Sequence, residues 1–171
     1  MTRTFRAVML IAVAAAGATT TAAAQGRQTW IEMQDGCGLR PGHFLVNSAV
    51  LHLKAATEAR FDDVRRNKLN DALRVLTEAV TRQQQENNPA AWYYFGRYYV
   101  EMGDAAGADS SFRRAEALAP QCKQDIDGYR EQVWGDALAA GLRTWQENKP
   151  DSAKLLLRQA AALRPSHPRA F

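Results

Sequence analysis

The feature that most constrains the fold is a run of aromatic, alanine and glycine residues over positions 92–120. In order, it contains Trp92, Phe95, Gly96, Tyr99, Gly103, Ala108, Phe112, Ala115 and Pro120. The three large aromatic positions before residue 100 recur three and four residues apart, so they fall on one stripe of a helix. The later alanine and phenylalanine positions form a similar stripe on a second helix, which Asp104 can cap and Pro120 stops. Because Gly96 has no side chain, the two helices can approach closely as a hairpin.

Weaker copies of this pattern flank it on both sides. Downstream, five of the positions recur at a constant offset of 45 residues, as Gly141, Ala153, Leu157, Ala160 and Pro165. Upstream, three positions recur at an offset of 36 residues, as Ala72, Leu76 and Ala79. In this copy Arg60 replaces the glycine and no proline closes the unit. The longer offsets predict that the second helix of the first unit continues through residues 83–86. They also predict a long first helix in the third unit, beginning near Asp125.

The central run resembles the tetratricopeptide repeat, whose consensus reads W-x2-L-G-x2-Y, then A-x3-F, then P, with Phe95 in place of the leucine. The resemblance implies an all-α fold in the form of a short right-handed solenoid of about three stacked helical hairpins. The expected hairpins span residues 45–86, 89–122 and 124–165, within a repeat domain of residues 44–171. An irregular arm of residues 25–43 precedes them.

Residues 1–24 have the layout of a secretory signal peptide. Arg3 and Arg6 precede the unbroken apolar run of residues 7–18, and a run of three alanines ends at Ala24, after which we expect cleavage. Twelve helical residues reach only about 18 Å, less than the roughly 30 Å that a permanent membrane span must cross. We therefore expect a periplasmic or secreted protein without a stable membrane span; an uncleaved anchor is the alternative.

Charge and motifs argue against several classes of function. The net charge of +4 falls to +2 without residues 1–24, which hold two arginines and no acid. A nearly balanced domain is not expected to bind nucleic acid through bulk charge. No G-x-S-x-G, P-loop or H-E-x-x-H sequence occurs, and His43, His52 and His167 are scattered. We predict no metal site, no cofactor and no enzymatic activity.

Cys37 and Cys122 are the only two cysteines. In the oxidising compartment that the leader predicts, they allow a single disulfide, and two buried thiols are the alternative. In the hairpin stack that the resemblance implies, Cys37 lies just before the first helix and Cys122 just after the fourth, so both are at the same edge. We predict a disulfide that fastens the arm across the first two hairpins.

Tetratricopeptide proteins generally bind a peptide or protein segment in a concave groove lined by the first helix of each hairpin, and the resemblance implies such a groove here. Its expected residues are Lys54, Thr57, Phe61, Val64 and Arg65 in the first unit, Ala90, Tyr93, Arg97, Val100 and Glu101 in the second, and Leu138, Leu142, Trp145 and Gln146 in the third. Three cations against one acid leave two surplus positive charges, which favours a partner with apolar anchors and an acidic group.

The alternative for the outer units is that Phe61, Leu142 and Trp145 belong to the core. Tyr93 and Arg97, in the unit that matches the consensus best, are the principal groove candidates. The remaining large aromatic residues of that unit are expected to be core without ligand contact: Trp92, Phe95, Tyr99 and Phe112.

The predicted function is that of a non-catalytic extracytoplasmic scaffold or adaptor in an envelope or secreted assembly. The alternative is an accessory protein that presents a glycan or peptide to an enzyme; it would be favoured if Tyr93, Tyr94 and Trp145 shared one exposed surface. Residues 155–157 are three consecutive leucines, which place apolar side chains on more than one face of the last helix. We therefore expect either self-association or a partner at that face, or a longer repeat array of which this chain is a fragment.

Overall fold

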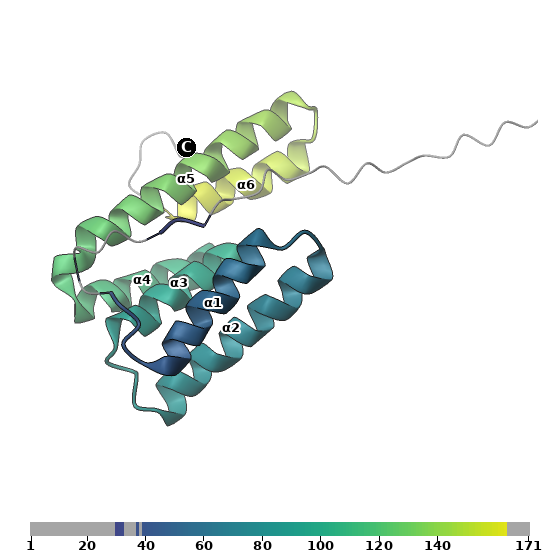
Figure 1. Cartoon of the computed structure of the whole chain (residues 1–171). Helices are drawn as coiled ribbons and strands as arrows, with labels where there is room; N and C mark the ends of the chain where they lie inside the picture. The colour runs from purple at the N-terminus through teal and green to yellow at the C-terminus, as the bar shows by residue number, and fades with distance from the viewer. Residues whose placement is uncertain (1–29, 33–36, 38, 164–171) are drawn as a thin grey trace, which may run out of the picture.

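The computed structural model of the protein describes residues 30–32, 37 and 39–163 (Figure 1). These residues contain six α-helices and no strand: α1 (Phe44–Glu58), α2 (Asp62–Arg82), α3 (Pro89–Met102), α4 (Ala105–Leu118), α5 (Lys123–Gln146) and α6 (Pro150–Leu163). One 3₁₀ turn, η1 (Pro120–Cys122), precedes α5. The prediction of an all-α fold is confirmed. The expected signal peptide with its cleavage after Ala24, and the proline expected to close the third unit, Pro165, lie outside the described residues.

Consecutive helices pair as hairpins, α1 with α2, α3 with α4, and α5 with α6 (Figure 1). Helix α3 contacts both helices of the first hairpin, whereas the third hairpin rests on the second chiefly through α6 and α4. Buried side chains from all six helices form one continuous core. Residues that precede α1, among them Trp30 and Ile31, pack against this core although they belong to no helix.

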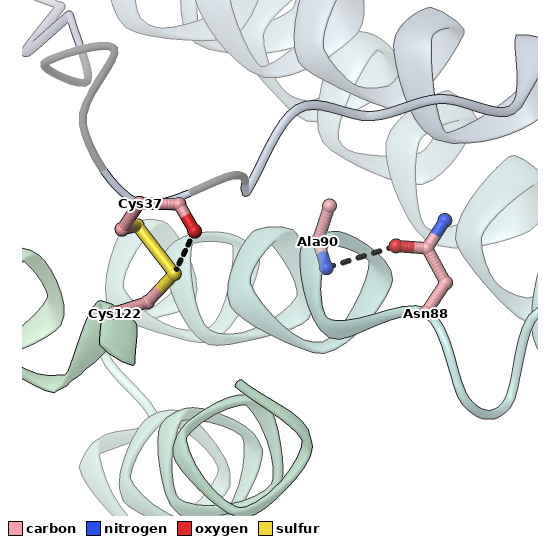
Figure 2. Close-up of a disulfide and its surroundings, with 4 residues drawn as sticks. All are labelled: Cys37, Asn88, Ala90 and Cys122. Atoms are coloured by element: carbon pink, nitrogen blue, oxygen red, sulfur yellow. Dashed lines mark hydrogen bonds between the residues drawn. A yellow bond between two sulfur atoms is a disulfide. The ribbon is translucent and has the colours of Figure 1, made fainter. Parts of the chain in front are cut away.

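The second hairpin begins and turns where the sequence signals indicate. Asn88 precedes Pro89, and its side-chain oxygen accepts a hydrogen bond of 3.0 Å from the backbone N–H of Ala90 (Figure 2). Gly103 ends α3 at a φ of 72°, in the left-handed region that favours glycine. Asp104 then accepts a hydrogen bond of 2.9 Å from the N–H of Gly107, which confirms it as the cap of α4.

Two glycines allow close helix packing at corresponding places in the second and third hairpins. A methyl group added at Gly96 would overlap the Phe112 ring, so the absence of a side chain lets α3 and α4 meet. A methyl group at Gly141 would lie 2.8 Å from Cδ2 of Leu157, the residue 45 positions after Phe112. The predicted role of Gly96 is confirmed, and the downstream copy reproduces the same small-against-large contact.

The expected helix through residues 83–86 is wrong, because α2 ends at Arg82. Gln84 has a φ of 55°, and the N–H of Gln85 bonds the carbonyl of Ala79 at 3.1 Å, which closes the helix with a left-handed turn. The extra length lies at the other end, where α2 begins at Asp62. In the third hairpin, the predicted long first helix is confirmed as the 24-residue α5.

A disulfide joins Cys37 to Cys122, with the two Cα atoms 4.9 Å apart (Figure 2). The predicted pairing is confirmed, and the alternative of two free thiols is wrong. Cys122 is fully buried at the end of η1, directly before α5. The bond therefore fastens the arm to the end of the second hairpin, directly after the fourth helix, where it was expected.

Candidate functional site: the face that holds the N-terminal arm

The side chain of Arg97 is the centre of the candidate site. It lies on α3 one turn after Tyr93, so both point to the same face of the helix. Although arginine is charged, Arg97 is only 4% exposed. Its guanidinium carbon lies 3.5 Å from the centroid of the Trp30 ring, 4.8 Å from that of Tyr129 and 5.9 Å from that of Tyr93. These distances are those of cation–π interactions, which stabilise a cation removed from water.

Three residues of the arm, Trp30–Glu32, contact α1 and α3, and we call them the arm segment. Figure 1 draws this segment as the dark purple stretch between the α5–α6 hairpin and the helices below it. Nη1 of Arg97 donates a hydrogen bond of 2.9 Å to the backbone carbonyl of Ile31. Nζ of Lys54, on α1, donates one of 2.9 Å to Oε1 of Glu32. That ammonium group holds the pKa of the Glu32 carboxyl below its usual value.

Lys54 and Arg97 contact the arm segment directly, and the rings of Tyr93 and Tyr129 lie beside Arg97. We call these four residues the arm site. Tyr93 and Tyr129 also contact Phe112, with ring centroids 5.8 Å and 5.7 Å from it. The arm site therefore consists of residues from α1, α3 and α5, and its two tyrosines pack on the core of the second hairpin. Residues from three helices meet there, which is the condition for a face that can hold an extended segment.

The charges on this face are divided between two places. Nη2 of Arg65 lies 2.7 Å from Oε2 of Glu101 and also donates to the Glu101 carbonyl at 2.9 Å. Arg65 and Glu101 thus neutralise each other, and Lys54 is paired with Glu32 of the arm segment. Within the described part of the chain no carboxylate forms an ion pair with Arg97, and its buried Nε has no hydrogen-bond partner. Because a buried charge is costly unless it is paired, this guanidinium depends on the groups that cover it.

Burial raises the pKa of Tyr129 to about 12, although the nearby Arg97 charge acts in the opposite direction. Burial likewise raises the pKa of Tyr93. Both phenols therefore stay protonated, and neutral towards Arg97, across the physiological range.

The shift of Tyr129 predicts a specific loss of stability in alkali. Its pKa is higher in the folded state, so its contribution is complete below about pH 10 and is lost as the pH rises toward 12. We expect wild type to lose about 1 kcal/mol more than Tyr129→Phe by about pH 11. Urea unfolding of both proteins at about pH 9 and about pH 11 measures this difference. An equal loss in both would show that Tyr129 is not the responsible group.

The structure places the predicted groove residues in three different environments. Tyr93, at 2% exposure, and Arg97 are covered by the arm segment and its neighbours and are not open to solvent. Phe61 caps α2 and Arg65 lies within α2, so the assignment of these residues, with Val64, to the first helix of the unit is wrong. The cause is the early start of α2, which moves the hairpin turn. Lys54 remains on α1, where it was expected.

The exposure of the apolar groove candidates decides whether the outer ones belong to the core. Phe61 is 67% exposed, Leu142 51% and Trp145 61%, so the interpretation of these three as core is wrong. Leu138 and Val100 are half-buried against the core. Leu155 is 60% exposed on α6, whereas Leu156 and Leu157 are partly buried, so only one of the three leucines points fully outward.

Sequence reasoning missed four residues of this site, namely Trp30, Ile31, Glu32 and Tyr129. The first three lie in a segment without periodicity, and Ile31 is 66 positions from the Arg97 that it contacts. For Tyr129 a signal existed, because Ile126, Tyr129 and Val133 recur three and four residues apart and are all buried on α5.

Away from the arm site, a hollow lies between α2, α3 and α4. It has a volume of about 320 Å³ and is lined by Leu73, Thr77, Val80, Trp92, Phe95, Tyr99, Gly107, Ser110 and Ser111. The predicted core role is confirmed for Phe95 and Phe112, which are buried. Trp92 and Tyr99 are only partly buried, and both line this hollow.

Comparison of the chain with protein-family models, with curated proteins and with solved structures found no match in any of the three. Among residues 30–32, 37 and 39–163, no three His, Cys, Asp or Glu side chains lie close enough together to hold a metal ion. None of the helices in these ranges is both long enough and apolar enough to cross a membrane.

Proposed function

We propose that the protein is a non-catalytic scaffold or adaptor of tetratricopeptide type, in which three hairpins stack as a short solenoid and the face formed by α1, α3 and α5 binds an extended protein segment. We propose further that it works outside the cytoplasm, in an envelope or secreted assembly. The expected partner carries apolar anchors and an acidic group.

The observation that supports this proposal is the way Arg97 holds the arm segment. The hydrogen bond from Nη1 goes to the backbone carbonyl of Ile31, a group that every peptide carries. The aromatic contact and the Lys54 ion pair then select for side chains on either side of that carbonyl. A face that recognises a backbone carbonyl and two flanking side chains has the chemistry that peptide recognition requires.

Two further observations favour the repeat architecture and the compartment. The contact of Gly96 with Phe112 recurs as that of Gly141 with Leu157 at the spacing of the sequence repeat. The disulfide is compatible with an oxidising compartment, as the predicted leader would require.

The accessory function, presentation of a glycan or peptide to an enzyme, is not favoured by any comparable observation. It would need Tyr93, Tyr94 and Trp145 on one exposed surface, and Tyr93 and Tyr94 are buried.

A peptide-display selection on the disulfide-bonded protein tests the proposal. We expect selected peptides to bind wild type and to lose affinity by several-fold on Lys54→Gln, whose side chain lies on the surface next to the arm segment. Isothermal titration calorimetry gives the affinities. Tyr93→Ala would be a poor choice of variant, because Tyr93 packs on Phe112 and Tyr129 and its loss would disturb the fold.

The matched control is Lys154→Gln, which removes the same charge from the exposed surface of α6. Selected peptides should bind this variant as they bind wild type. A selection that enriches no peptide, or peptides that respond equally to both lysine substitutions, would refute the α1/α3/α5 face as a binding surface.

A further inference from the structure

The arm segment contacts the arm site with three chemically different groups. Trp30 stacks its ring on the Arg97 guanidinium at 3.5 Å. Ile31 contributes its backbone carbonyl to Nη1 of the same arginine, and Glu32 contributes a carboxylate to Lys54. In chain order, the three groups are an aromatic ring, a backbone carbonyl, which a residue of any type can supply, and a carboxylate.

We propose that the arm segment is an internal occupant of the arm site, and that the external partner is a peptide with an aromatic residue two positions before an acidic one, which displaces it. This inference rests on the proposed function and adds to it the partner's chemistry and the competition that controls access.

The burial of Arg97 indicates what an occupant of the arm site must supply. A guanidinium without an ion-pair partner is stable at 4% exposure only while aromatic faces and a carbonyl replace its water. If the arm segment leaves, the Trp30 ring and the Ile31 carbonyl leave together, and water takes their place at the guanidinium. A peptide that displaces the arm segment and covers Arg97 again offsets the loss of this water with an equivalent ring and carbonyl, and its acid replaces Glu32 at Lys54.

Covalent connection makes the internal occupant a strong competitor. Cys37 follows Glu32 by five residues and is bonded to Cys122, so the arm segment stays near the site even when it detaches. A connection of so few residues gives an effective concentration of about 1 mM. An external peptide therefore binds wild type more weakly than it binds a protein whose arm segment cannot compete.

The test uses a fluorescent peptide with the sequence of residues 28–34, Gln-Thr-Trp-Ile-Glu-Met-Gln, and the full disulfide-bonded protein. Fluorescence anisotropy compares wild type with the variant Trp30→Ala/Glu32→Ala. If the free site binds the peptide with a Kd of about 0.1 mM or lower, an arm segment at about 1 mM predicts that the variant binds the peptide at least about tenfold more tightly than wild type. Adding Lys54→Gln to the variant should weaken binding of this peptide but not of the same peptide with Gln in place of Glu.

A second variant controls for the possibility that the double substitution changes the fold. Glu32 lies at the surface, so Glu32→Lys places a like charge beside Lys54 without removing any buried group. It should raise peptide affinity in the same direction as the double substitution. Circular dichroism and urea unfolding verify that both variants retain the helical fold.

The outcomes separate the two proposals. If peptides without the aromatic and acidic residues bind as tightly, or if wild type and the arm variants bind the probe equally, the internal-occupant inference is overturned while peptide binding by the face stands. If wild type proves to be a dimer whose arm segments are exchanged between two copies, the inference is also overturned. If no peptide binds any of the proteins, both proposals fall.

Discussion

Removing the Cys37–Cys122 disulfide is expected to lower the free energy of unfolding by about 4.6 kcal/mol. The bond joins residues 85 positions apart, and a closed loop of that length strongly restricts the unfolded chain. For a domain of this size, the loss corresponds to a fall in melting temperature of about 10 to 20 °C. Few other single changes in this chain are expected to have so large an effect.

Urea unfolding of the Cys37→Ala/Cys122→Ala variant, compared with oxidised wild type, measures this difference. Alanine is preferred to serine because Cys122 is fully buried and a hydroxyl there would add an unrelated penalty. Reduced wild type is the control, and it should unfold near the same urea concentration as the variant. If oxidised and reduced wild type unfold together, the loop-closure argument does not apply to this bond.

Phe112→Ala is expected to destabilise the fold by about 3 to 5 kcal/mol, the range for removing a large buried ring. Phe112 is fully buried and lies between Gly96 on one side and the rings of Tyr93 and Tyr129 on the other. Its removal would leave a cavity where the second hairpin meets α5 and where the arm site is supported. Thermal and urea unfolding followed by circular dichroism measure the loss.

The partner of Phe112 gives an independent check on this contact. Gly96→Ala should cost about 1 to 3 kcal/mol, because the added methyl group overlaps the ring. In a Phe112→Leu background the same change should cost clearly less, since the two substitutions act on one contact. Gly128→Ala on α5 is the matched control. Nothing lies near its added methyl group, so it should be neutral or stabilise by about 0.5 to 1 kcal/mol.

The second hairpin could be predicted almost completely because its signals are local. Asn88 and Pro89 start α3, Gly103 and Asp104 make the turn, and Pro120 follows the end of α4. The turn of the first hairpin, Ala59-Arg60-Phe61, contains neither glycine nor proline. Without such a residue, the repeat offset extends the predicted first helix past this turn, as far as Arg65, whereas Asp62 and Asp63 already form the first turn of α2.

Some residues of the candidate site could be named from the sequence. The resemblance implied that Lys54, Arg97 and Glu101 line one groove, and the structure places Lys54 and Arg97 against the arm segment. The charge of Lys54 is paired there with Glu32, and that of Arg65 with Glu101. The groove itself stays a prediction. The occupant of that face could not be predicted, because contacts between an aperiodic arm and a helix 66 positions away leave no spacing in the sequence. A repeat pattern identifies helix faces that recur along the sequence. The arm segment is not part of any repeat, so no such pattern could identify it.

The position of the disulfide has a mechanical consequence. A pull on the two ends of the chain would pass from Cys37 directly to Cys122, so the first two hairpins, which lie between them, would carry no load. Among the residues that the structure describes, the arm segment and the third hairpin lie in the path of the force. The few contacts of Trp30–Glu32 would yield before any helix extends, and α5 and α6 together could then lengthen to about 140 Å. Tension in an assembly that holds both ends would thus uncover Arg97 first, while α1 and α3, which carry Lys54 and Arg97, stay folded.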